Sequence, residues 1–124
     1  MRISPQIVRL DCCTESNIYV VKTAPLEYVL IDTGIPGLAD RIIIELRNMD
    51  IQPKLIKHIF LTHHEEDHIG NAKQLQFMTG ASLWADPEDI PYILKKKRRH
   101  GHSLIQDMRL KYEVPFEIKP FEPG

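Results

Sequence analysis

The sequence has no hydrophobic run long enough to cross a bilayer. Its longest apolar stretches, such as residues 18–21 and 28–31, are far shorter than the roughly 20 apolar residues of a membrane-spanning helix. No secretory signal is visible either, because Arg9 and Asp11 interrupt the apolar stretch that a signal would need near the N-terminus. These absences predict a protein with no membrane partner and a cytoplasmic location.

Cysteine is scarce and neither sign of charge is in excess. The two cysteines, Cys12 and Cys13, are adjacent and cannot join distant segments, so we expect reduced thiols. The 16 Lys+Arg and 17 Asp+Glu leave a net charge of −1, without the basic character typical of nucleic-acid-binding proteins. The one basic cluster, residues 95–99, is typical of a solvated helix end. No Walker, Rossmann or G-x-S-x-G motif is present.

The 124 residues fit one small domain, and their hydrophobic pattern predicts an α/β protein. Apolar residues at helical spacing predict helices over residues 38–49 and 72–78. The second has Ala72, Leu75 and Met78 on its apolar face and ends at Gly80. Asp86 is expected to cap a third helix that runs through Leu94. The tail, residues 114–124, could add an edge strand. Short β-branched and aromatic runs predict strands at residues 7–10, 17–22, 27–31, 55–61 and 82–85. Paired strands followed by strand–helix alternation indicate a layered α/β architecture.

One segment concentrates the side chains that can do chemistry. Residues 63–68 read His-His-Glu-Glu-Asp-His, and each of them can titrate or bind a metal. They follow the predicted strand 55–61, so they project from the carboxyl end of a strand, where α/β folds usually place their sites. Imidazole and carboxylate ligands suit zinc, iron or manganese, and the lack of cysteine argues against a Cys-rich structural zinc site. The alternative is a solvated polar loop that caps a helix, and six consecutive titratable residues favour the metal site.

Two motifs, in the order in which they occur in the chain, resemble those of the metallo-β-lactamase-fold superfamily of metal-dependent hydrolases. Residues 62–70, T-H-H-E-E-D-H-I-G, resemble the signature T-H-x-H-x-D-H-x-G, and residues 30–34, L-I-D-T-G, are similar to the strand-end D-T-G segment of that family. The resemblance covers roughly residues 17–85. It implies that residues 1–124 form a single truncated domain of the α/β (α+β layered) class, equivalent to the N-terminal half of a metallo-β-lactamase-like αββα sandwich.

The resemblance also implies a metal site and a reaction. By position in the motif, His63 and Glu65 would bind a first metal, and Asp67 and His68 a second. Zinc is the metal that the family implies, with iron or manganese as alternatives. A metal-bound hydroxide would attack an ester, thioester, lactone, amide or phosphodiester bond of a small-molecule substrate. Asp67 would be the catalytic residue, because it would help to orient that hydroxide.

Other residues near the motif are expected to take no direct part in the reaction. Asp32 would accept a hydrogen bond that fixes either a ligand imidazole or the metal-binding loop. Thr33 and Gly34 are expected to form the turn. His64 and Glu66 occupy the two variable positions of the motif and would take no part.

The sequence departs from the family in two respects, which leave other functions open. Glu65 stands where the hydrolases normally have histidine. A glutamate at this position is similar to the pattern in the di-iron domain of flavodiiron oxidoreductases. The segments that carry the family's remaining ligands are missing, and His100 and His102 do not match them. The chain could therefore be a di-iron oxidoreductase-like domain or an inactive metal-binding module. Half a sandwich leaves apolar surface uncovered, so we expect a homo-oligomer or a partner that supplies the missing half.

Overall fold

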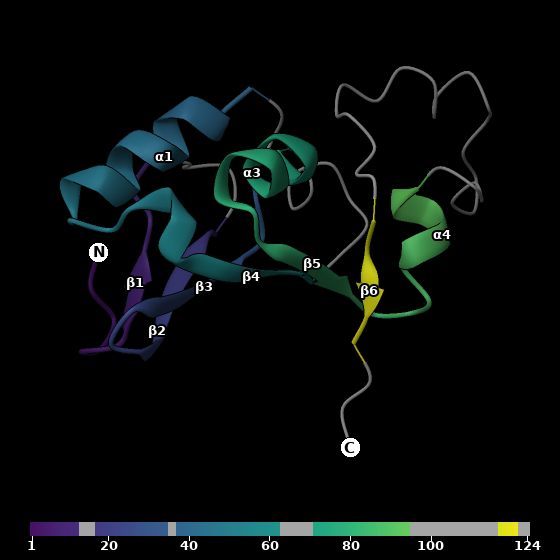
Figure 1. Cartoon of the computed structure of the whole chain (residues 1–124), viewed down its shortest axis with the longest axis horizontal. Helices are drawn as coiled ribbons and strands as arrows, with labels where there is room; N and C mark the ends of the chain where they lie inside the picture. Colours follow the sequence, from purple (N-terminus) through teal and green to yellow (C-terminus); the bar gives the residue numbers. More distant parts are fainter. Residues whose placement is uncertain (13–16, 35–36, 63–70, 95–116, 122–124) are drawn as a thin grey trace.

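The computed structural model describes residues 1–12, 17–34, 37–62, 71–94 and 117–121 (Figure 1). Its centre is a six-stranded sheet with the strands in chain order. Strands β1, β2 and β3 are antiparallel neighbours, and β4, β5 and β6 continue the sheet parallel to β3. The strands are β1 (Ile7–Arg9), β2 (Tyr19–Ala24), β3 (Glu27–Ile31), β4 (Ile56–Leu61), β5 (Ser82–Ala85) and β6 (Lys119–Pro120). The helices are α1 (Ala39–Asn48), the 3₁₀ helix η1 (Pro53–Leu55), α3 (Ala72–Thr79) and α4 (Ile90–Ile93).

Helices α1 and α3 lie on the same face of the sheet (Figure 1). Alternate residues of each strand point toward these helices. Their side chains and those of the helices form the core. The central members are buried to 1% exposure or less, namely Leu30, Ile59 and Leu83 from the strands, Ile42 and Leu46 from α1, and Leu75 from α3. No helix in the described part of the chain is long and apolar enough to cross a membrane.

The predicted elements are confirmed, with differences at some boundaries. Gly80 ends α3 in the left-handed region, at φ 72°. The Oδ1 atom of Asp86 accepts a hydrogen bond from the backbone N–H of Glu88 at 2.8 Å, but the helix itself begins only at Ile90. On α3 the expected inward residue Met78 is 40% exposed, and Thr79 is buried in its place. The face that packs on the sheet therefore follows residues 72, 75 and 79.

The opposite face of the sheet carries a row of register partners that crosses all the strands. Arg9, Tyr19, Ile31, Phe60, Trp84 and Lys119 pair with one another in this order from β1 to β6. We call this surface the open face, because α1 and α3 both lie on the other side of the sheet. The tail contributes to it as predicted: β6 is an edge strand, and Phe121 lies edge-on to Phe60 at 5.2 Å between ring centroids.

Candidate functional site

The carboxyl ends of the parallel strands β3 and β4 meet at one edge of the sheet. Ile31 is in register with Phe60, so Asp32 and Thr62, which follow these strands, lie beside each other. The Asp32 carboxylate accepts hydrogen bonds from the backbone N–H and the hydroxyl of Thr62, at 2.7 and 2.6 Å. The N–H of Asp32 donates to the carbonyl of Phe60 at 2.8 Å. Asp32 therefore holds the residue that directly precedes His63.

Asp32 occupies an unusual position for a charged residue. Its side chain is 4% exposed, and its backbone has φ 66°, in the left-handed region. Asp tolerates this region better than most residues, because its short polar side chain can form local hydrogen bonds. Taking a carboxylate out of water is costly unless strong hydrogen bonds replace its hydration, and the bonds from Thr62 do so here. Strained, buried polar residues of this kind concentrate at functional sites.

Asn71 forms a second anchor at the start of α3. Its backbone N–H donates to Oγ1 of Thr33 at 3.1 Å, and its Nδ2 donates to the carbonyl of Thr33. Its Oδ1 accepts from the N–H of Leu38 at 3.0 Å. Asn at the N-cap usually accepts a hydrogen bond from its own helix, but Asn71 makes no such bond. Its side chain instead ties α3 to the segment that leads into α1.

The two anchors hold both ends of the segment that carries the predicted ligands. Asp32 binds Thr62, the last residue before residues 63–70, and Thr33 binds Asn71, the first residue after them. Thr33 thus does more than form the turn expected of it. Sequence reasoning missed Asn71, and its only signal was a polar residue between the motif and the first apolar residue of the next helix.

The predicted ligands themselves, His63, Glu65, Asp67 and His68, lie outside the described residues. The same holds for His64 and Glu66, for His100 and His102, and for the basic cluster at residues 95–99. Within the described ranges, no group of three or more His, Cys, Asp or Glu side chains could hold a metal ion. The donor set at residues 63–68 stays a prediction, and its imidazoles and carboxylates are ligands that zinc, iron and manganese accept.

A third segment reaches the same edge of the sheet. After β1 the chain continues to Leu10, whose N–H donates to the carbonyl of Ile18 at 2.8 Å, one step beyond the pair Arg9 and Tyr19. The Glu45 carboxylate of α1 accepts hydrogen bonds from the N–H groups of Asp11 and Cys12, at 2.7 and 2.8 Å. Because Tyr19 pairs with Ile31, Glu45 fixes this connection at the end of the sheet where Asp32 lies.

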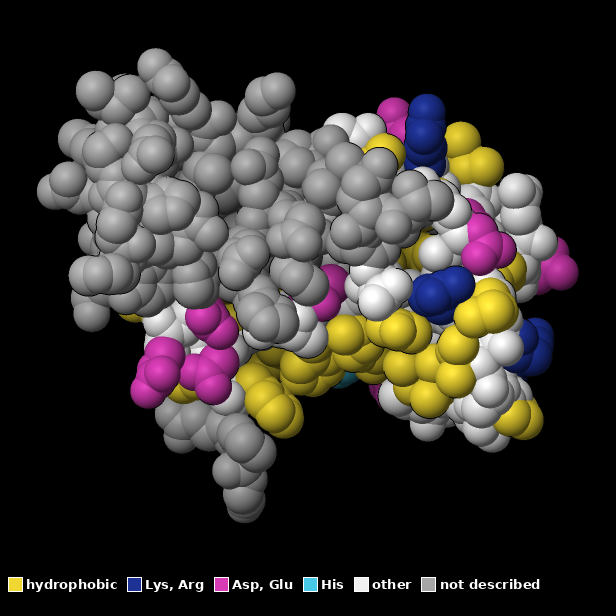
Figure 2. All heavy atoms as spheres, turned by 180° about the vertical axis from the view of Figure 1, so that it is seen from behind, with side chains coloured by type: hydrophobic (Ala, Val, Ile, Leu, Met, Phe, Trp, Pro, Cys, Tyr) yellow, Lys and Arg dark blue, Asp and Glu magenta, His cyan; other side chains and the backbone are white. Residues whose placement is uncertain are grey.

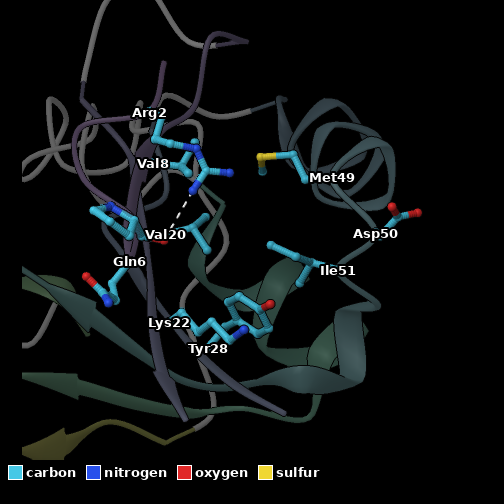
Figure 3. A pocket seen from close by; sticks show the side chains of 10 residues that line it. Arg2, Gln6, Val8, Val20, Lys22, Tyr28, Met49, Asp50 and Ile51 are labelled. Carbon is cyan, nitrogen blue, oxygen red and sulfur yellow. Dashed lines mark hydrogen bonds between the residues drawn. The ribbon is translucent and has the colours of Figure 1, made fainter. Parts of the chain in front are cut away.

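The cavity drawn in Figure 3 lies at the other end of the sheet. Its volume is about 290 Å³, and its lining includes Arg2, Lys22, Tyr28 and Met49. Tyr28 precedes Asp32 by four positions along β3, which corresponds to about 13 Å of extended chain. The guanidinium of Arg2 is already engaged, since it donates to the carbonyl of Pro5 at 3.1 Å. This cavity is therefore separate from the candidate site.

Comparisons with known proteins agree with this arrangement. The family model described as the metallo-β-lactamase superfamily matches residues 13–123. The probable metallo-hydrolase YflN of Bacillus subtilis (strain 168) is 29% identical over 84 residues, which are 66% of this chain and 32% of YflN. A Cronobacter sakazakii metallo-β-lactamase with a HARLDQ motif superposes with a TM-score of 0.80 at 20% identity, over 98% of this chain and 46% of its own.

A further solved relative is a B3 metallo-β-lactamase described as having an active-site glutamic acid. It superposes with a TM-score of 0.70 at 23% identity, over 87% of this chain and 40% of its own. At these identities the solved structures establish the fold alone. The chain spans about a third of the curated relative and less than half of each of these solved chains.

Proposed function

This chain belongs to the metallo-β-lactamase superfamily, and from that membership we propose that it is a metal-dependent hydrolase module. The metal would be held by His63, Glu65, Asp67 and His68, in a two-metal zinc site. The observation that carries the proposal is the pair of anchors at residues 62 and 71. They hold both ends of the one segment in which imidazoles and carboxylates are concentrated, at the carboxyl end of parallel strands.

The chain's own residues would contribute position and proton handling. A bound metal supplies Lewis acidity, which lowers the pKa of coordinated water and polarises the carbonyl or phosphoryl oxygen of a substrate. We propose Asp67 as both a ligand and the carboxylate that orients the attacking water. Asp32 acts one step away, by keeping the start of the segment in place through Thr62. The substrate is proposed to be a small cytoplasmic molecule with an ester, thioester, lactone, amide or phosphodiester bond.

Glu65 is compatible with this hydrolase proposal. A carboxylate at a ligand position adds negative charge, which weakens the pull of a metal on its water. One of the solved relatives is nevertheless described as a metallo-β-lactamase with an active-site glutamic acid. The glutamate alone therefore gives no reason to prefer the di-iron oxidoreductase alternative, and the identity of the bound metal distinguishes the two.

Activity of this chain by itself is expected to be weak. It spans 32% of the curated relative and 40–46% of the solved relatives described above, and we propose that residues outside this stretch complete the ligand set and position a substrate. Poor positioning alone lowers rates by about 100-fold. We therefore expect fewer than two equivalents of bound metal and at most slight hydrolysis of simple esters.

The test is elemental analysis of purified protein, before and after loading with zinc, beside an ester-hydrolysis assay. Asp67→Ala should remove most of the metal and any residual hydrolysis. Asp40→Ala, at an exposed position of α1, is the matched control and should leave both unchanged. Failure of the wild-type chain to take up metal, or full metal retention by Asp67→Ala, would overturn the proposal. Iron without hydrolysis would overturn the hydrolase assignment in favour of the oxidoreductase.

A further inference from the structure

One wall of the cavity in Figure 3 is the face of the sheet that α1 covers. Arg2 forms an antiparallel bridge with Val8 of β1, and Val8 pairs with Val20 of β2. Directly paired residues share a face of a sheet, and Val20 belongs to the core beneath α1. Lys22 lies two positions beyond Val20 on the same strand and pairs with Tyr28 of β3. All five side chains therefore point to the same side of the sheet.

The end of α1 closes the cavity with apolar side chains. The N–H of Asp50, which has φ 61°, donates to the carbonyl of Arg47 at 2.9 Å. The next N–H, that of Ile51, donates to the carbonyl of Leu46 at 2.9 Å. These two bonds form a Schellman motif, which turns the chain at the end of a helix. The turn places Met49 and Ile51 on the cavity, and Figure 3 shows the Asp50 carboxylate directed away from the other lining side chains.

Two cations stand at opposite ends of this apolar space. Figure 3 shows Arg2 at one end of the cavity and Lys22 beside Tyr28 at the other. The bond from Arg2 to the carbonyl of Pro5 uses one of the five N–H donors of the guanidinium and fixes its position. Within the described residues, the Lys22 ammonium and the Tyr28 hydroxyl form no hydrogen bond or ion pair. Donors at both ends are therefore available to a ligand.

We propose that this cavity binds a small, elongated dicarboxylate, in which a short apolar spacer joins the two carboxylates. One carboxylate would accept hydrogen bonds from the Arg2 guanidinium, whose planar donors match its geometry. The other would lie between the Lys22 ammonium and the Tyr28 hydroxyl. The spacer would contact Val20 and Ile51, which are 2% and 6% exposed. Apolar walls with a few convergent polar groups are typical of small-molecule sites.

The dimensions of the cavity suit two separated charges. Its volume of about 290 Å³ is close to the lower end of the range for small-molecule sites. Arg2 and Lys22 are two strands apart across the sheet and two residues apart along it, which corresponds to roughly 12 Å between their Cα atoms. Their long side chains shorten this span between the charged groups. The site therefore favours a dicarboxylate over a compact anion such as inorganic phosphate.

The cations of the cavity act as a local pair. The chain has a net charge of −1, so its overall field does not attract anions. Figure 2 shows Lys and Arg side chains as separate spots among other residues on the described part of the surface in that view. Asp50 also lines a neighbouring recess with Arg47 and Gln52, so it lies on the border of the cavity. Anion binding here would depend on Arg2 and Lys22 themselves.

The experiment is a titration of ¹⁵N-labelled, chelator-treated protein with adipate at constant ionic strength, followed by amide chemical shifts. The chelator prevents the carboxylates from binding a metal instead. We expect saturable shifts at Val20, Lys22 and Ile51 with a Kd of about 1 mM, which is typical of so small a ligand. Hexanoate, with one carboxylate on a chain of the same length, should bind about 10-fold more weakly. Hexanediol and inorganic phosphate should give no saturable shifts at these residues.

Matched variants assign the two ends of the site. Lys22→Met removes the ammonium but keeps an unbranched side chain, and it should weaken adipate binding by about 10-fold, to the level of hexanoate. Arg2→Met should do the same at the other end. Lys54→Met makes the same change of charge at an exposed position of η1 outside the cavity lining, so it should bind adipate like the wild type. Circular dichroism verifies the fold of each variant.

Three results would overturn the proposal. The first is the absence of saturable shifts at about 20 times the expected Kd. The second is an adipate affinity that both Lys22→Met and Arg2→Met leave unchanged. The third is a set of shifts confined to Thr62 and Asn71, which would assign the anion to the candidate metal site. The lining of the cavity includes none of the predicted metal ligands, so a failure of the hydrolase proposal would leave the expected result intact.

Discussion

Replacing Asp32 by alanine should destabilise the fold and weaken metal binding together. The substitution removes a carboxylate that is 4% exposed and accepts two hydrogen bonds from Thr62. Hydrogen bonds to a charged group contribute about 1.5–3 kcal/mol each, and a donor left without its acceptor adds to the loss. Alanine at φ 66° also costs roughly 1 kcal/mol, which aspartate partly avoids. We expect a loss of about 4–7 kcal/mol, which is a large part of a total stability of about 5–15 kcal/mol.

A matched control separates the hydrogen bonds from the backbone strain. Asp50 is the other described non-glycine residue with positive φ, at 61°, and it is exposed. Asp50→Ala therefore carries the strain without a buried carboxylate and should cost only about 1 kcal/mol. Asp32→Asn keeps the shape and loses the charge, so it should fall between the two.

The assay is urea unfolding followed by circular dichroism and Trp84 fluorescence, with metal affinity measured by chelator competition. Asp32→Ala should lower metal affinity by about 10–100-fold, as is usual when a residue that supports metal ligands is removed. Thr62→Val removes the hydroxyl but leaves the backbone N–H. Its effect should be non-additive with that of Asp32→Ala by about 1 kcal/mol, because they share one hydrogen bond. Equal losses for Asp32→Ala and Asp50→Ala would refute this account.

Two further predictions concern the second anchor, Asn71, and the Glu45 carboxylate that fixes the connection after β1. Asn71→Ala should lower stability by about 2–3 kcal/mol in thermal unfolding, because it removes the side-chain bonds to Thr33 and Leu38 from a residue that is 1% exposed. The control is Asn48→Ala, on the exposed end of α1. Similar melting temperatures of the two variants would contradict the prediction. Glu45→Ala should speed amide hydrogen exchange of Asp11 and Cys12 by about 10-fold, since it removes the acceptor of their N–H groups. The control Glu88→Ala, at an exposed position, should leave this exchange unchanged. Unchanged exchange in Glu45→Ala would show that the carboxylate does not hold this connection.

The sequence predicts most of the fold because its signals are local. The strands at residues 27–31 and 82–85 are apolar runs bounded by turn residues, and both are found with those bounds. Gly80 ends its helix as expected, because a left-handed residue there is a local requirement. Met78 was wrong as a core residue because its orientation depends on how α3 rotates against the sheet, and helical spacing allows either Met78 or Thr79 to face inward.

The side-chain hydrogen bonds of Asn71 and Glu45 were harder to predict because their partners are distant in sequence. Asn71 bonds to Thr33 across 38 positions, and Glu45 reaches Asp11 across 34. Each of these side chains has a local interpretation, Asn71 as a helix cap and Glu45 as a solvated helix residue, and nothing nearby indicates otherwise. The resemblance to the family did indicate that Asp32 would fix either an imidazole or the loop. The bonds to Thr62 attach Asp32 to the residue that precedes the loop, and the ligand roles at residues 63–68 stay predictions.

Metal binding and turnover should be separable in this chain, because the two anchors hold both ends of the segment that carries the predicted ligands. The bonds from Asp32 and Thr33 to the two ends of residues 63–70 lie within the first three quarters of the chain, so they need no second half of a domain to form. Substrate positioning, by contrast, is expected to need further residues, because the chain spans 32% of the curated relative and 40–46% of the solved ones. We therefore expect the chain to take up metal even where it hydrolyses simple esters only slightly. Equal metal uptake by Asp32→Ala and by its control Asp50→Ala would contradict this dependence on the anchors.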